Sequence, residues 1–237
     1  MNKIAVVSLD IPEICSALKQ FGFKLIYTES VDGFISYEKK HADMQCLSVD
    51  SKLFVLSQCE ILGQELINSG FDVTYTSKLA SGDYPNNILL NAQIVGKTVI
   101  GKINSLDIKL VDYLKKNDYH FVNVKQGYTA CSCVKVDNNS IITADNSIYN
   151  ALTNTNIDVL KIEEGNIVLH GAEDRTHGFI GGASTLIDEN NLLFFGDIKK
   201  HPDYNRIKSF CESKNVSIHS INNIPLTDIG GAILLNN

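Results

Sequence analysis

The chain has no tryptophan, only two methionines and four prolines, and no long apolar run. A membrane-spanning helix needs about 20 consecutive apolar residues. The first apolar stretch, Ile4–Leu9, is followed at once by Asp10 and is too short for the hydrophobic region of a secretory signal. We therefore expect a cytoplasmic protein with no membrane partner.

Clustered basic residues are also missing. The 237 residues include 21 Lys and Arg against 27 Asp and Glu, which gives a formal net charge of -6. Nucleic-acid sites need a dense basic face, so no nucleic-acid partner is expected. Six cysteines without an export signal are interpreted as reduced thiols. Cys131-x-Cys133 has no second pair, so we expect neither a metal nor a cofactor, and zinc held by these two thiols and a histidine is the weaker alternative.

A recurring phrase dominates the rest of the sequence. "LKQFGFKLIYT" (18–28) returns as "LINSGFDVTYT" (66–76), and looser copies start at Leu114, Leu152 and Phe210. In each copy an amphipathic segment stops at Gly, Asn or Asp, residues that tolerate the left-handed backbone of a helix end, and an alternating strand follows. An apolar strand precedes each helix, and a further strand joined by a polar turn precedes that strand. The repeat therefore predicts units with the order strand–strand–helix–strand, or ββαβ.

The first unit lacks its opening strand, and the C-terminus supplies one. "FIGGASTL" (179–186) opens the fifth unit, and "DIGGAILL" (228–235) near the end of the chain shares its I-G-G-A. A C-terminal strand in the first unit closes a ring and removes the open sheet edges. The alternative is an ordinary α/β sheet with coincidental similarity. We predict one domain, residues 1–237, with approximate units 1–40 plus 224–237, 41–78, 84–124, 126–169 and 178–223.

A closed ring of five ββαβ units resembles the pentein fold, the α/β propeller of the guanidine-modifying enzymes (GME fold). The string "YPNNILLNA…KQGYTACS…GFIGGAS…HPD…LTDIGGAI" is also similar to a largely clostridial, Gram-positive family of that fold whose function is unknown. The resemblance leaves the activity open, because penteins include hydrolases, amidinotransferases and a non-catalytic ribosome-associated factor. Catalytic penteins use a Cys near the C-terminus, a His, and a Glu-Gly-Gly-Asp stretch whose acids hold a guanidinium. Here Ile and Ala flank both Gly-Gly pairs, and no Cys follows Cys211.

The ends of the opening strands converge at the axis of such a ring, and convergent strand ends are the usual place for a ligand. The predicted ligand-binding residues are Asn91, Ser132, Gly181, Gly182, Ser184, Gly230, Gly231, Asp83 and Asn86. Glycine within a strand marks a close approach of backbone or ligand. The Gly-Gly pairs therefore either present backbone to a ligand or leave room where five strands crowd together. For Asp83 and Asn86, a plain turn is favoured over a ligand-facing loop.

The segment "ACSC" supplies the catalytic candidate. In a strand, Cys131 and Cys133 point to one face and Ser132 to the other. A nucleophilic cysteine needs a base or a cation beside it, and His177 precedes the next opening strand. The carboxylate of Asp228 is a candidate to bind a cationic group of the ligand. It could equally cap the turn that precedes it. A buried, inert cysteine is the competing interpretation.

Three functions follow from these features. The leading one is a protein that binds a small polar ligand, amino-acid-like or guanidine-like, in the axial site. The first alternative is a Cys-dependent hydrolase or amidinotransferase acting on a C–N bond of an amidine or guanidine, in which Cys131 attacks, His177 moves the proton and Asp228 holds the cation. The second alternative is a non-catalytic ribosome- or protein-binding module that uses a flat face of the ring. The ligand and the oligomeric state stay open.

Overall fold

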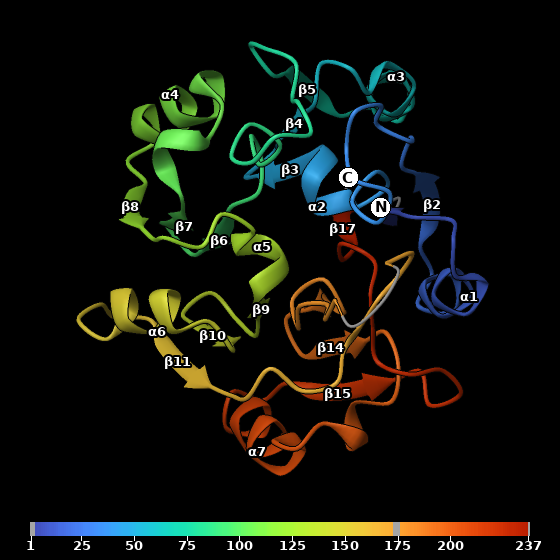
Figure 1. The fold of residues 1–237 in the computed structure, drawn as a ribbon, viewed down its shortest axis with the longest axis vertical. Coiled ribbons are helices and arrows are strands. Elements are labelled where there is room, and N and C mark those ends of the chain that lie inside the picture. The colour runs from blue at the N-terminus through green and yellow to red at the C-terminus, as the bar shows by residue number, and fades with distance from the viewer. Residues whose placement is uncertain (1–2, 173–175, 237) are drawn as a thin grey trace.

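Five small three-stranded sheets surround a common axis (Figure 1). The structure is a computed structural model and describes residues 3–172 and 176–236. The first sheet contains β17 (Ile233–Asn236), β1 (Lys3–Val7) and β2 (Lys24–Tyr27), and the second contains β3 (Cys46–Val49), β4 (Lys52–Val55) and β5 (Asp72–Tyr75). The third contains β6 (Gln93–Val95), β7 (Thr98–Gly101) and β8 (His120–Asn123), and the fourth contains β9 (Cys133–Lys135), β10 (Ser140–Thr143) and β11 (Asp158–Lys161). The fifth contains β13 (Ser184–Asp188), β14 (Asn191–Phe194) and β15 (Ser217–Ser220). The main helices are α1 (Pro12–Gln20), α3 (Glu60–Asn68), α4 (Ile108–Lys116), α6 (Asn146–Leu152) and α7 (Tyr204–Ser213).

Each sheet has the same topology. The opening strand pairs antiparallel with the middle strand. The last strand pairs parallel with the middle strand after a helical crossover. This is the predicted ββαβ unit, and the five-bladed α/β propeller is confirmed.

The C-terminal strand closes the ring. β17 pairs with β1 in the register Lys3↔Asn236 to Val6↔Ile233 and so completes the first unit. The opening strands β3, β17, β13, β9 and β6 contact one another in that order around the axis. The five main helices lie on the outer rim (Figure 1). Residues that precede the opening strands in different units therefore meet near the axis.

Four of the five main helices end as the recurring phrase predicts, and α6, which is followed by Thr153 with φ -57°, does not. Gly22, Gly70, Asp118 and Asn215 follow helices α1, α3, α4 and α7, and each has a positive φ between 57° and 93°. Gly adopts this conformation without strain, and Asn and Asp tolerate it. The backbone then turns directly into the last strand of the unit.

The middle strands form the core of each unit. In β1, β4, β7, β10 and β14 nearly every residue is buried. A strand covered on both faces has a continuous apolar sequence rather than an alternating one. The largest buried side chains include Phe54, Phe194 and Phe195. In the described part of the chain, no helix has both the length and the apolarity needed to cross a membrane.

Two local features differ from the sequence prediction. Cys131 and Ser132 do not lie in a strand, because Thr129–Ser132 forms the one-turn helix α5 and β9 begins only at Cys133. The Ser132 amide donates to the Tyr128 carbonyl at 3.0 Å, which closes that turn. In addition, β12 (Val168–Leu169) pairs in parallel with β16 (Thr227–Asp228), a short sheet that the repeat did not predict.

Candidate active site

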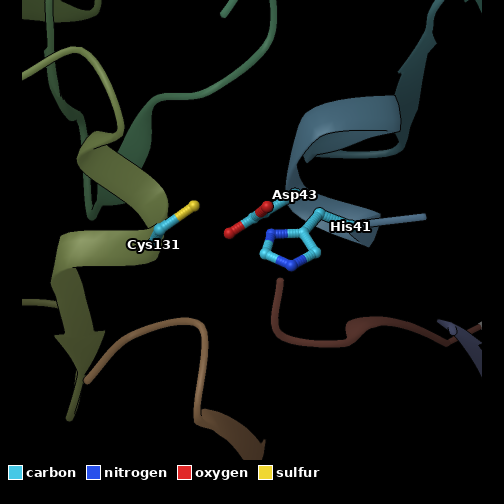
Figure 2. A group of neighbouring side chains, drawn as sticks. All are labelled: His41, Asp43 and Cys131. Atoms are coloured by element: carbon cyan, nitrogen blue, oxygen red, sulfur yellow. The ribbon is translucent and has the colours of Figure 1, made fainter. Parts of the chain in front are cut away.

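A thiol, an imidazole and a carboxylate meet where the chain enters two of the opening strands. His41 and Asp43 lie at the start of the short helix α2 (Ala42–Gln45), which leads into β3. Cys131 lies in α5, which leads into β9, and its sulfur points across to the other two side chains (Figure 2). One potential donor atom from each of the three residues lies within 4.8 Å of the other two. All three side chains are buried.

Asn91 joins the two short helices. Its Nδ2 donates to the Asp43 carbonyl at 3.2 Å and to Cys131 Sγ at 3.3 Å. Its Oδ1 accepts from the Ala130 amide at 2.8 Å. Asn91 is fully buried, so these hydrogen bonds have no competition from water. One side chain from the third unit thus fixes the second and fourth units relative to each other.

Asp228 supplies a second buried carboxylate. It lies in β16 directly before β17, and its oxygens accept from the Phe179 amide at 2.8 Å and the Gly230 amide at 2.9 Å. A Cβ at Gly182 would overlap the Asp228 carboxylate. The I-G-G stretch of the fifth unit is therefore glycine-rich because this carboxylate packs directly on its backbone. Burial raises the pKa of Asp228, and the nearby His41 partly opposes that shift.

His41 is positioned to exchange protons. Burial lowers the pKa of His41, and Asp228 and Glu38 oppose this effect. The imidazole is therefore neutral at neutral pH and has a nitrogen free to accept a proton. Gly230, with φ 76°, packs against its side chain, where a Cβ would overlap it. Nε2 of His41 is buried without a hydrogen-bond partner among the described residues.

The resting thiol is protonated. Burial raises the pKa of Cys131 well above its ordinary value, and the charges of Asp43 and Asp228 raise it further, while the hydrogen bond from Asn91 opposes them. Burial and the charge of Asp228 also raise the pKa of Asp43 well above 3.8. Asp43 Oδ1 is buried and has no hydrogen-bond partner in the described ranges. A positive charge placed here would oppose both shifts.

A third carboxylate extends the cluster. Glu38 is buried, and its Oε2 accepts from Asn87 Nδ2 at 3.0 Å. The same amide nitrogen donates to the Tyr128 hydroxyl at 2.8 Å. Across residues 3–172 and 176–236, no Lys or Arg forms an ion pair with Glu38, Asp43 or Asp228. Buried carboxylates without basic partners favour a cationic ligand.

Two cavities border the cluster, one at Asp43 and the other at His41. The larger, about 430 Å³, is bordered by Asp43 and by residues of all five opening strands. The smaller, about 130 Å³, is bordered by His41, His170 and the Lys40–Asp10 ion pair. Cavities of about 300–1,000 Å³ are typical of small-ligand sites.

Several predicted residues lie at the site. Cys131, Asp228 and Asn91 belong to the cluster, and Gly182 and Gly230 pack against Asp228 and His41. Three more predicted residues border the larger cavity: Gly181, Ser184 and Gly231. Gly181, Gly182 and Gly230 thus occupy crowded positions next to the cluster, whereas Gly231 has room for a Cβ but a φ of 69°.

The remaining predicted residues lie elsewhere. His177 is exposed and borders a separate cavity of about 150 Å³ together with Ser132. The Ser132 hydroxyl is buried without a partner among the described residues. Asp83 and Asn86 lie in an exposed turn, closed by a 2.7 Å hydrogen bond from the Asn86 amide to the Asp83 carbonyl.

The sequence interpretation missed His41 and Asp43. The repeat contained the signal, because "HADMQ" precedes the opening strand of the second unit as "YTACS" precedes that of the fourth. Equivalent positions in a closed ring face the same axis. Comparison of these two junctions would have paired His41, rather than His177, with Cys131.

Comparison with known proteins places the chain in a family. The model of a family of unknown function, DUF6873, matches residues 6–233. The chain belongs to that family. No curated protein shows significant sequence similarity to it.

Solved structures with the same fold are enzymes. A dimethylarginine dimethylaminohydrolase adduct with S-methyl-L-thiocitrulline is 8% identical with a TM-score of 0.62, and the match covers 99% of this chain and 100% of that one. SxtG, an amidinotransferase of saxitoxin biosynthesis from Microseira wollei, is 11% identical with a TM-score of 0.58, covering 89% and 76%. Agmatine deiminase from C. jejuni is 12% identical with a TM-score of 0.55, covering 93% and 88%. These matches confirm that this DUF6873 protein has the pentein fold.

Proposed function

We propose that this protein is a cysteine-dependent enzyme that acts on a C–N bond of a cationic amidine or guanidine, as a hydrolase or an amidinotransferase. The observation that carries the proposal is the approach of Cys131, His41 and Asp43 within 4.8 Å around the axis. The names of the structural neighbours, an amidinotransferase, an agmatine deiminase and a dimethylarginine dimethylaminohydrolase, support this reaction class. The cysteine is not near the C-terminus, but in a ring of equivalent units any unit can present it to the axis.

The carboxylates select the substrate. Asp43 and Asp228 are both buried, the charges of both act on the thiol, and neither forms an ion pair with a Lys or Arg in the described part of the chain. A planar guanidinium or amidinium forms paired, charge-assisted hydrogen bonds with carboxylates. Its charge also lowers the pKa of Cys131, because it neutralises the two carboxylates that raise it. The thiol is therefore unreactive in the free protein and becomes activated when a cation binds.

The proposed reaction has two steps. Neutral His41 takes the proton of Cys131, and Sγ forms a bond to the central carbon of the substrate. The C–N bond to the leaving amine breaks, and the amine takes the proton from His41. Water or an acceptor amine then attacks the same carbon and gives its proton to His41. The C–S bond breaks, and the leaving sulfur takes the proton from His41, which regenerates the Cys131 thiol and the neutral imidazole.

Two reagents of matched shape test the proposal. 2-Chloroacetamidine is a cation at neutral pH, whereas 2-chloroacetamide is neutral, and both alkylate thiols. A charge-assisted contact of about 2 kcal/mol corresponds to about a 30-fold rate difference. We expect peptide mass spectrometry to show Cys131 alkylated by the amidine at least about 30-fold faster than by the amide.

Variants separate the roles. Asp228→Asn should remove most of the preference for the amidine, whereas Asp112→Asn, at an exposed position of α4, should leave it unchanged. Equal rates for the two reagents, or alkylation of other cysteines before Cys131, would contradict the proposal. If benzamidine raises the melting temperature but no reagent reaches Cys131, the site binds cations without this chemistry, as the ligand-binding alternative predicts.

A further inference from the structure

We propose that His41, Asp43 and Cys131 also form a binding site for Zn²⁺, which competes with the cationic substrate and inhibits the enzyme. The site brings one nitrogen, one oxygen and one sulfur donor within 4.8 Å of one another. The three residues come from two short helices in different units, and their side chains converge on one point (Figure 2). The metal binding depends on this donor geometry alone, whereas the inhibition rests on the proposed function.

The donor set selects the metal. Zn²⁺ accepts Cys sulfur, His nitrogen and Asp oxygen together, whereas Mg²⁺ and Ca²⁺ prefer oxygen alone. A tetrahedral zinc ion holds its ligands about 3.5 Å apart. Ligand atoms within 4.8 Å therefore need to move by only about 1 Å. Three protein ligands leave the fourth position for water.

Independent features of the site favour a bound cation. Asp43 Oδ1 is buried and has no partner in the described ranges, and the residue is only 5% exposed. Asp228 adds a further buried carboxyl group. The larger cavity borders Asp43, and the smaller cavity borders His41. Asn91 Nδ2 contacts Cys131 Sγ at 3.3 Å and can stabilise the metal-bound thiolate.

Binding would block the reaction. The thiol loses its proton to solvent when its sulfur coordinates zinc. The sulfur lone pair, the imidazole nitrogen and the Asp43 oxygen are then all occupied. Neither nucleophilic attack nor proton transfer can proceed until the ion leaves.

Cobalt substitution tests the site directly. Co²⁺ bound by a thiolate gives a near-ultraviolet charge-transfer band, and a tetrahedral site gives intense visible bands. We expect one equivalent of Co²⁺ to produce both in the wild-type protein, and Zn²⁺ to abolish them by displacement. Cys131→Ser should lose the charge-transfer band, and His41→Ala should weaken binding at least about tenfold. Cys133→Ser, a change at a neighbouring buried thiol, should retain the band.

A protection assay covers the case in which a variant fails to fold. In the wild-type protein, one equivalent of Zn²⁺ should slow alkylation of Cys131 by 2-chloroacetamidine at least tenfold, and EDTA should restore the rate. No cobalt band together with no protection overturns the inference. A band that survives in Cys131→Ser but disappears in Cys133→Ser also overturns it. The rate in metal-free protein reports on the proposed enzyme alone, so the two proposals can fail separately.

Discussion

Asn91 offers a direct test of how the ring holds its site. In Asn91→Ala, the Ala130 amide loses its acceptor at 2.8 Å and the Asp43 carbonyl loses its donor at 3.2 Å. A buried polar backbone group without a partner costs about 1–3 kcal/mol, and the Ala130 group is only partly buried. We therefore expect the free energy of unfolding to fall by about 2–4 kcal/mol.

Urea unfolding followed by far-ultraviolet circular dichroism measures this loss. The matched control is Asn68→Ala at the end of α3, where the exposed side chain accepts one hydrogen bond from Gln64 at 3.0 Å. That change should alter the free energy of unfolding by less than about 0.5 kcal/mol. A loss below about 1 kcal/mol for Asn91→Ala would show that Asn91 does not couple the second and fourth units.

Two further substitutions probe the buried carboxylates. Burial raises the pKa of Asp43 well above 3.8, so the folded state holds the carboxyl proton more tightly than the unfolded state does. The stabilisation that the bound proton gives the folded state is lost as pH rises through the folded pKa. As pH rises, the free energy of unfolding of Asp43→Asn should therefore increase relative to that of the wild type, by up to about 1.4 kcal/mol per pH unit. Urea unfolding measures both values, and a difference between them that does not change with pH would refute this. Gly182→Ala places a methyl group against the Asp228 carboxylate and should cost about 1–3 kcal/mol, seen as a lower melting temperature. Gly101→Ala, whose new Cβ would contact Ala92 and Leu106 at ordinary distances, should be neutral or stabilising, and equal effects of the two changes would contradict the packing argument.

The repeat was predictable because its signals are local. The glycine, asparagine or aspartate that ends a helix acts within a few residues, and four of these positions have the expected positive φ. The middle strands have continuous apolar segments, such as residues 4–7 in β1 and 141–142 in β10, because helices and neighbouring units cover them. The shared I-G-G-A predicted the partner of the first unit, and β17 pairs with β1 accordingly.

Short-range structure at the site was less predictable. "ACSC" was expected to be a strand, but Cys131 lies in the helical turn α5. The turn is held by the Asn91 side chain, which lies 39 positions away in the sequence and accepts a hydrogen bond from the Ala130 amide. A one-turn helix has too few internal hydrogen bonds to form without such a partner.

The sequence by itself determined the five units, their order and the closure of the ring, since each depends on backbone preferences and apolar patterns within about 50 residues. It also supplied Cys131, Asp228 and Asn91 as residues near the axis. Only the tertiary structure decided that His41 and Asp43, about 90 positions from Cys131, share its site, and that His177 borders a different cavity. The reason is that contacts across the axis depend on the rotation between units and on the paths of the junctions before the opening strands, and no local pattern specifies either.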